Sequence, residues 1–143
     1  MSIKSFNNQG GFTLLELLIV IVIIGILALL IIPNITSAPK KARDTTRKTD
    51  ITAIRKGLEE YFVNNNAYPA ALTDLQSGSA PIIRTLPVDP KNVDPYVYTY
   101  TPANTNTTYT LNACLENDQD NGANVVAAVA PCTTKTFQLI NGN

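Results

Sequence analysis

The apolar residues of the chain are concentrated in one long N-terminal run. Residues 12–35 are almost all aliphatic, and no charged side chain occurs between Leu17 and Ile32. As an α-helix of about 24 residues, this run would rise roughly 36 Å, which exceeds the hydrocarbon core of a bilayer, about 30 Å thick. No face of such a helix is polar, so it differs from a surface amphipathic helix. The pattern predicts a transmembrane helix over residues 12–35.

A second helical pattern extends over residues 36–66. Apolar residues return at intervals of mostly three or four positions, which is the period of an amphipathic helix. The stripe consists of Ala38, Ala42, Ile51, Ile54, Leu58, Tyr61 and Phe62. It is weak between Ala42 and Ile51, where threonines intervene. Three asparagines, Asn64 to Asn66, end the pattern, and we expect the C-terminal part of the chain to cover the stripe near its end.

Residues 67–143 are predicted to form a small globular head built on a β-sheet. An irregular connection with a short helix near residues 72–76 comes first. Four strand candidates follow, at Tyr96–Thr101, Thr108–Glu116, Asn124–Ala130 and Lys135–Ile140. Tyrosines alternate along the first of them, as in a half-buried strand. The expected fold class is α+β: a long N-terminal helix, with a membrane half and an amphipathic half, packed on a small antiparallel sheet.

Charge and composition exclude several function classes. The chain has 11 basic and 11 acidic residues and no histidine, which removes the commonest general base and metal ligand at neutral pH. No nucleophile–base pair and no phosphate-binding loop is recognisable, so we expect the protein not to be an enzyme. The basic residues gather in residues 40–56 on a helical pattern without interleaved aromatics, so no nucleic-acid site is evident.

Glu16 is a charged residue at the start of the apolar run. A carboxylate at mid-bilayer depth costs about 2–3 kcal/mol, and less near the interface, so such residues usually have a partner. An ordinary secretory signal has a basic start and an uncharged apolar core. Here the start carries only Lys4 and the α-amine. A Glu16 that reaches the lipid headgroups is one interpretation, and pairing with a cation is the other.

The sequence GFTLLELLIV from Gly11 to Val20, followed by Gly25 and Pro33, resembles the class III signal of type IV prepilins and type II secretion pseudopilins. The resemblance implies that residues 1–11 are a leader, which prepilin peptidase cuts after Gly11, and that the new Phe12 amine is N-methylated. It also implies a filament polymerised through the N-terminal helix. In such a filament, the Glu16 carboxylate of one subunit would meet the Phe12 amine of the next and fix the register.

Gly25 and Pro33 mark a place where the helix could bend. Pro33 removes the amide that would donate to the Leu29 carbonyl. The resemblance implies that residues 25–33 lose helical order when subunits enter a filament. A proline kink in an otherwise intact helix is the alternative.

Two cysteines, Cys114 and Cys132, lie in the predicted head. An isolated pair in an exported domain most often forms one disulfide, although two unpaired buried thiols are the alternative. The bridge would close a loop of about 19 residues and stabilise the fold by roughly 3 kcal/mol. Type IVa pilins, which the chain resembles, also have a cysteine-closed loop near the C-terminus, whereas major pseudopilins usually lack it. This feature favours a pilus subunit.

Glu116, Asp118 and Asp120 alternate before Gly122. Oxygen ligands at such spacing can hold calcium. However, the glycine comes one position late for an EF-hand loop, and no glutamate follows at the twelfth position. An acidic turn between strands is therefore the preferred interpretation, and we expect no cofactor other than this candidate calcium ion.

These features predict a structural subunit of a type IV pilus that serves adhesion, motility or DNA uptake. The alternatives are a pseudopilin of a type II secretion system and a signal-anchored exported binding domain. The expected partners are identical or related pilin subunits, prepilin peptidase, the pilus assembly platform and the inner membrane. The protein would cross that membrane once with an external head, then enter an extracellular pilus or a periplasmic pseudopilus. The basic residues after the apolar run favour a cytoplasmic head instead, but the cysteines and the resemblance favour an external one.

Overall fold

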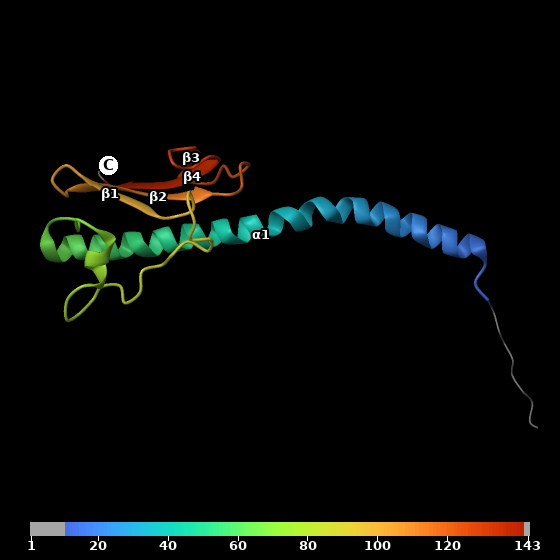
Figure 1. Cartoon of the computed structure of the whole chain (residues 1–143), viewed down its shortest axis with the longest axis horizontal. Helices are drawn as coiled ribbons and strands as arrows, with labels where there is room; N and C mark the ends of the chain where they lie inside the picture. The colour runs from blue at the N-terminus through green and yellow to red at the C-terminus, as the bar shows by residue number, and fades with distance from the viewer. Residues whose placement is uncertain (1–10, 142–143) are drawn as a thin grey trace, which may run out of the picture. The chain divides into compact units, whose positions relative to one another are not determined.

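The computed structural model describes residues 11–141, and for residues 30–36 only the helical backbone. The predicted leader therefore lies outside the described residues, apart from Gly11. The chain forms two compact units that divide between Thr36 and Ser37. One helix, α1 (Leu14–Asn65), contributes to both units (Figure 1).

Among the described residues of the first unit, the large apolar side chains are exposed. From Phe12 to Leu29, every large apolar residue is exposed, and the exposed fraction ranges from 48% at Val20 to 88% at Phe12. Gly25 and Pro33 both lie within the helical backbone of α1. The loss of helical order around them in a filament stays a prediction.

Within the part of the chain that the structure describes, no helix combines the length and the apolarity needed to cross a membrane. The transmembrane helix over residues 12–35 therefore stays a prediction.

The second unit carries the predicted head. A 3-10 helix, η1 (Leu72–Gln76), precedes four strands, which are β1 (Thr99–Ala103), β2 (Thr108–Leu115), β3 (Val125–Ala127) and β4 (Lys135–Asn141). They form one antiparallel sheet in the order β1-β2-β4-β3. The α+β class and all four strands are thus confirmed.

Six of the eight strand ends differ from the prediction, by three residues at the start of β1 and at the end of β3 and by one or two residues elsewhere. β1 starts at Thr99 because Tyr96 instead forms an isolated bridge with Val93, in a tight local turn. β3 is shorter than predicted at its start because Asn124 has a φ of 61°. That left-handed conformation is tolerated by asparagine but is not part of an extended strand.

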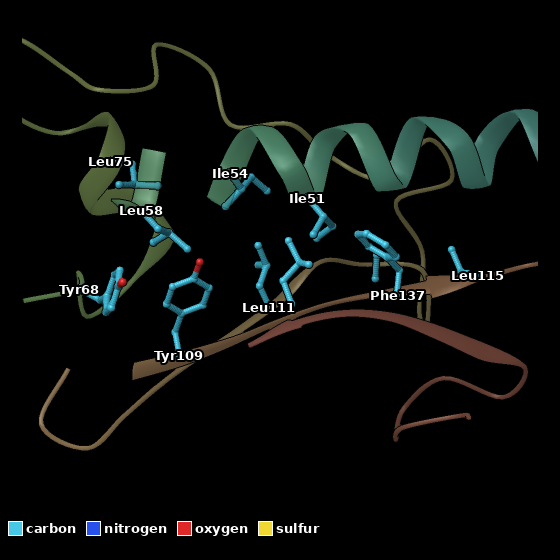
Figure 2. Packing of buried hydrophobic residues seen from close by; sticks show 11 residues of the cluster. Ile51, Ile54, Leu58, Tyr68, Leu75, Tyr109, Leu111, Leu115 and Phe137 are labelled. Atoms are coloured by element: carbon cyan, nitrogen blue, oxygen red, sulfur yellow. The ribbon is translucent and has the colours of Figure 1, made fainter. Parts of the chain in front are cut away.

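The core lies between α1 and one face of the sheet. Ile51, Ile54 and Leu58 of α1 are fully buried. They face the inward side chains of β2 and β4, among them Tyr109, Leu111, Leu115 and Phe137 (Figure 2). A side chain of this size contributes about 1.5–3 kcal/mol when fully buried. The C-terminal half of the apolar stripe therefore holds α1 against the sheet, as the sequence predicted.

The N-terminal half of that stripe has no role in the buried face of α1. Ala38 and Ala42 are exposed. The buried face of α1 instead continues from Ile51 through Arg47 and Asp44, which are 0% and 2% exposed. These positions keep the three-to-four spacing of a helix face, so the segment that looks weakly apolar in sequence is a buried ionic one.

Candidate functional site

The predicted processing site lies just before α1. Gly11 and Phe12 are exposed and belong to no helix or strand. α1 begins at Leu14, so Thr13 occupies the N-cap position. The peptide bond between Gly11 and Phe12 is therefore in an accessible, non-helical segment, as proteolysis requires.

Glu16 is held by the N-cap of its own helix. The Thr13 amide and hydroxyl donate to Glu16 Oε2 at 2.9 and 2.8 Å, and the Glu16 amide donates to Thr13 Oγ1 at 3.2 Å. This reciprocal arrangement is a capping box. Thr13 was not among the predicted site residues, although the T-x-x-E pattern that indicates a capping box is present in the sequence. The pairing of Glu16 with the Phe12 amine of another subunit stays a prediction.

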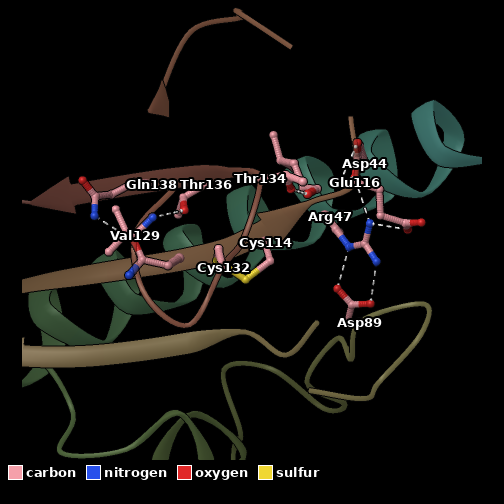
Figure 3. The surroundings of a disulfide bond; sticks show 12 residues. Asp44, Arg47, Asp89, Cys114, Glu116, Val129, Cys132, Thr134, Thr136 and Gln138 are labelled. Carbon is pink, nitrogen blue, oxygen red and sulfur yellow. Dashed lines mark hydrogen bonds and ion pairs between the residues drawn. A yellow bond between two sulfur atoms is a disulfide. The ribbon is translucent and has the colours of Figure 1, made fainter. Parts of the chain in front are cut away.

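A buried ionic cluster joins the head to α1 around Asp44 and Arg47. The Arg47 guanidinium donates to Asp89 Oδ2 at 2.6 Å and Oδ1 at 2.9 Å (Figure 3). Its Nη1 donates to Asp44 Oδ1 and Glu116 Oε1, both at 2.8 Å. Arg47 therefore ties α1 to the connection before β1 and to the end of β2. Arg47 was not among the predicted site residues, because a helix face defined by apolar residues assigns charged side chains to solvent.

Glu116 receives two further cations. Arg43 Nε donates to its Oε1 and Arg43 Nη2 to its Oε2, each at 2.7 Å. Lys91 Nζ lies 2.8 Å from Oε2. Arg43, followed by Lys91 and Arg47, holds the pKa of Glu116 far below its usual range, although burial of the carboxylate acts in the opposite direction. The carboxylate is therefore ionised throughout the physiological pH range.

Asp44 completes the cluster on the backbone side. Its carboxylate accepts hydrogen bonds from the amides of Glu116 and Asn117, each with a shortest distance of 2.9 Å. Among the described residues, no buried side-chain nitrogen or oxygen lacks a partner. The three carboxylates, Asp44, Asp89 and Glu116, balance the three cations, Arg43, Arg47 and Lys91. The cluster therefore satisfies the main condition for burying charge, which is full pairing.

The candidate calcium residues are not gathered into a ligand set. Glu116 is taken up by the ionic cluster, Asp118 is exposed, and Asp120 Oδ2 lies 2.6 Å from Lys48 Nζ. Within the described residues, no group of three or more acidic or cysteine side chains could hold a metal ion. The preferred interpretation, an acidic turn between strands with calcium only as the alternative, stays a prediction.

Cys114 and Cys132 form a disulfide, with their Cα atoms 5.1 Å apart. The bond joins the end of β2 to the segment before β4 (Figure 3). Next to it, the Thr134 hydroxyl donates to the Leu115 carbonyl. The chain between the cysteines, which includes the acidic turn and β3, is thus fastened at both ends.

Two protein families match consecutive parts of the chain. Residues 6–32 match the family described as "Prokaryotic N-terminal methylation motif". Residues 34–130 match "Type II secretion system (T2SS), protein G". No solved structure matches the chain significantly.

Several similar proteins carry the name "Type II secretion system core protein G". The Pseudomonas aeruginosa protein is 39% identical over 106 residues, which cover 64% of this chain and 74% of the relative. The Escherichia coli protein is 40% identical over 74 residues, covering 52% of this chain and 51% of the relative. The Aeromonas hydrophila protein is 48% identical over 63 residues, or 44% of each chain. The matched region thus spans only about half of the latter two relatives.

These matches favour the pseudopilin alternative over the type IV pilus prediction, which they do not confirm. The resemblance to a prepilin at the N-terminus is confirmed by the methylation-motif match. Since the second family covers most of the amphipathic helix and the head, the chain belongs to the type II secretion system protein G family.

Proposed function

We propose that this protein is a pseudopilin that polymerises into a short periplasmic filament of a type II secretion system. The observation that carries the proposal is the order of the two family matches. A methylation motif over residues 6–32 leads directly into a protein G match over residues 34–130. The similar proteins named core protein G support the same assignment.

The structure supplies a physical reason for polymerisation. The apolar side chains from Phe12 to Leu29 are exposed within their own unit. Exposed apolar surface of this extent is unfavourable in water at about 25 cal/mol per Å² and marks a membrane or protein interface. In the proposed cycle, the inner membrane covers it first, with the head outside. Identical or related subunits, delivered by the assembly platform, cover it in the filament.

Processing and pairing complete the proposal. Prepilin peptidase cuts the accessible bond after Gly11, and the Phe12 amine is methylated. The Glu16 carboxylate, already oriented toward the helix start by Thr13, pairs with the Phe12 amine of an adjacent copy. The protein acts as a structural subunit and not as an enzyme.

The decisive measurement is the intact mass and N-terminal sequence of the protein purified from its membrane. A chain that begins with methylated Phe12 is expected. A chain that begins at Pro39 would show an ordinary signal peptide cut after Ala38 and would refute the proposal.

Glu16→Gln tests the pairing. The variant should be processed normally but should lose nearly all filament formation when filaments are recovered from the opened periplasm and quantified by immunoblot. Glu60→Gln is the matched control, because Glu60 is an exposed acid of the same helix. Normal fibres from Glu16→Gln would contradict the pairing.

A type IV pilus is the second candidate, and the Cys114–Cys132 disulfide favours it. The two functions separate in a deletion strain. Loss of surface fibres with normal secretion would indicate a pilus, whereas accumulation of unsecreted proteins in the periplasm would indicate a pseudopilus.

A further inference from the structure

The acidic loop, defined as residues 116–122, raises the question of which cations neutralise it. It follows β2 in the connection to β3 and contains three carboxylates. Calcium would require six to eight oxygen ligands at about 2.3–2.6 Å around one point. The contacts of Glu116 and Asp120 decide whether such a set is available.

Both oxygens of Glu116 are already bound by positive groups. Oε1 accepts from Arg43 and Arg47, at 2.7 and 2.8 Å. Oε2 lies 2.7 Å from Arg43 Nη2 and 2.8 Å from Lys91 Nζ. A divalent cation at either oxygen would stand within a few ångströms of two fixed positive charges and would be repelled by them.

Both carboxylate oxygens of Asp120 also have partners already. Its Oδ2 lies 2.6 Å from Lys48 Nζ, and its Oδ1 accepts from the Gly122 amide at 3.0 Å. A β-carbon placed on Gly122 would stand 3.2 Å from Asp120 Oδ1 and 3.5 Å from Lys48 Nζ. The ammonium therefore occupies the space beside Asp120 that a metal ion and its ligands would need.

Lys48 is itself held in place from the sheet side. Its Nζ lies 5.8 Å from the centroid of the Phe137 ring of β4, within the range of a cation–π contact. The aliphatic part of the side chain starts from α1, one residue after the buried Arg47. The ammonium thus has a defined position between helix, sheet and loop.

We infer that side-chain cations, with Lys48 at Asp120 and Arg43, Arg47 and Lys91 at Glu116, take the place of a metal ion as the permanent counter-ions of the acidic loop. The residues present do not fit a calcium site. The head therefore holds this loop against α1 without calcium, and the strength of that attachment depends on Lys48. The inference concerns the isolated subunit and does not require filament formation.

The test uses the full chain in detergent, with unfolding followed by near-ultraviolet circular dichroism of the tyrosines. The melting temperature should be the same, within about 1 °C, in 2 mM calcium chloride and in excess EGTA, because a ligand stabilises only the state that it binds. Lys48→Met should lower the melting temperature by roughly 3–6 °C in both solutions. Lys56→Met is the matched control, since Lys56 is an exposed lysine two turns further along α1.

Charge exchange distinguishes the ion pair from simple packing. Lys48→Glu and Asp120→Lys should each destabilise the chain, and the double variant should recover at least half of the summed loss. Two results would overturn the inference. One is a calcium-dependent rise in melting temperature of more than about 3 °C in the unaltered chain. The other is a Lys48→Met variant that melts like Lys56→Met.

Discussion

Replacement of Arg47 by methionine is the sharpest test of the buried ionic cluster. Methionine keeps much of the length of the side chain but removes the guanidinium that makes four hydrogen bonds, to Asp44, Asp89 and Glu116. The three acids differ in how many hydrogen-bond donors they keep after this change. Glu116 retains Arg43 and Lys91, and Asp44 retains two backbone amides. Among the described residues, Asp89 retains as hydrogen-bond donor only the Lys91 amide, at 2.8 Å.

The expected cost follows from that inequality. Removal of one partner of a buried ion pair typically costs about 3–5 kcal/mol, because it leaves a buried charge uncompensated. Since two of the three acids here keep other donors, we expect a value near 3 kcal/mol, centred on Asp89. That is a large part of the total stability of a small domain, about 5–15 kcal/mol. With a urea slope of about 1.5 kcal/mol per molar, the midpoint should fall by about 2 M.

Urea unfolding followed by tyrosine circular dichroism measures this shift directly. Arg55→Met is the control, since Arg55 is an exposed arginine of the same helix. Adding Asp89→Asn to Arg47→Met should restore part of the loss, because it removes the unpaired charge. A midpoint shift below about 0.5 M, or no recovery in the double variant, would refute the reasoning.

Two further predictions concern the same end of the head. The paired change Cys114→Ser with Cys132→Ser should cost about 3 kcal/mol, and dithiothreitol should lower the urea midpoint of the unaltered chain but not of the variant. Equal sensitivity of both proteins to dithiothreitol would contradict this. The second prediction concerns the dependence of stability on pH. Folding lowers the pKa of Glu116 from its usual value of 4.5, mainly through Arg43. The stabilising effect of the Glu116 carboxylate is therefore fully present above pH 4.5, and it is lost as the pH falls toward the lower folded-state pKa. The urea midpoint should therefore fall between pH 6 and pH 3, and it should fall less in Glu116→Gln.

The elements of the fold were predictable because their residue patterns are local. The positions of β2 and β4 were predicted to within one residue, and the three-to-four spacing of Ile51, Ile54 and Leu58 predicted the buried face of α1. The end of α1 was also predicted from its asparagines. Asn66, with a φ of 56°, donates its amide to the Phe62 carbonyl at 2.8 Å, as a left-handed residue after a helix does.

The ionic cluster could not be predicted in the same way. Its members are separated by up to 73 positions, since Arg43 pairs with Glu116. Each of them looks like an ordinary exposed charge in its local sequence. Only the folded chain brings the connection before β1 and the end of β2 to the same turn of α1. The interruption of the apolar stripe between Ala42 and Ile51 was the one local indication, and it was interpreted as weakness.

The cluster also determines which part of α1 the head contacts, and the geometry of Arg47 is the reason. An apolar stripe alone would tolerate a displacement by one helical turn, because the same kind of surface recurs. The guanidinium of Arg47 donates through Nε and Nη2 to the two carboxylate oxygens of Asp89. A lysine cannot reproduce this bidentate geometry. Arg47→Lys should therefore destabilise the head nearly as much as Arg47→Met, despite its conserved charge. If Arg47→Lys instead matched the unaltered chain in urea, charge alone would hold α1, and the cluster would fix no particular register.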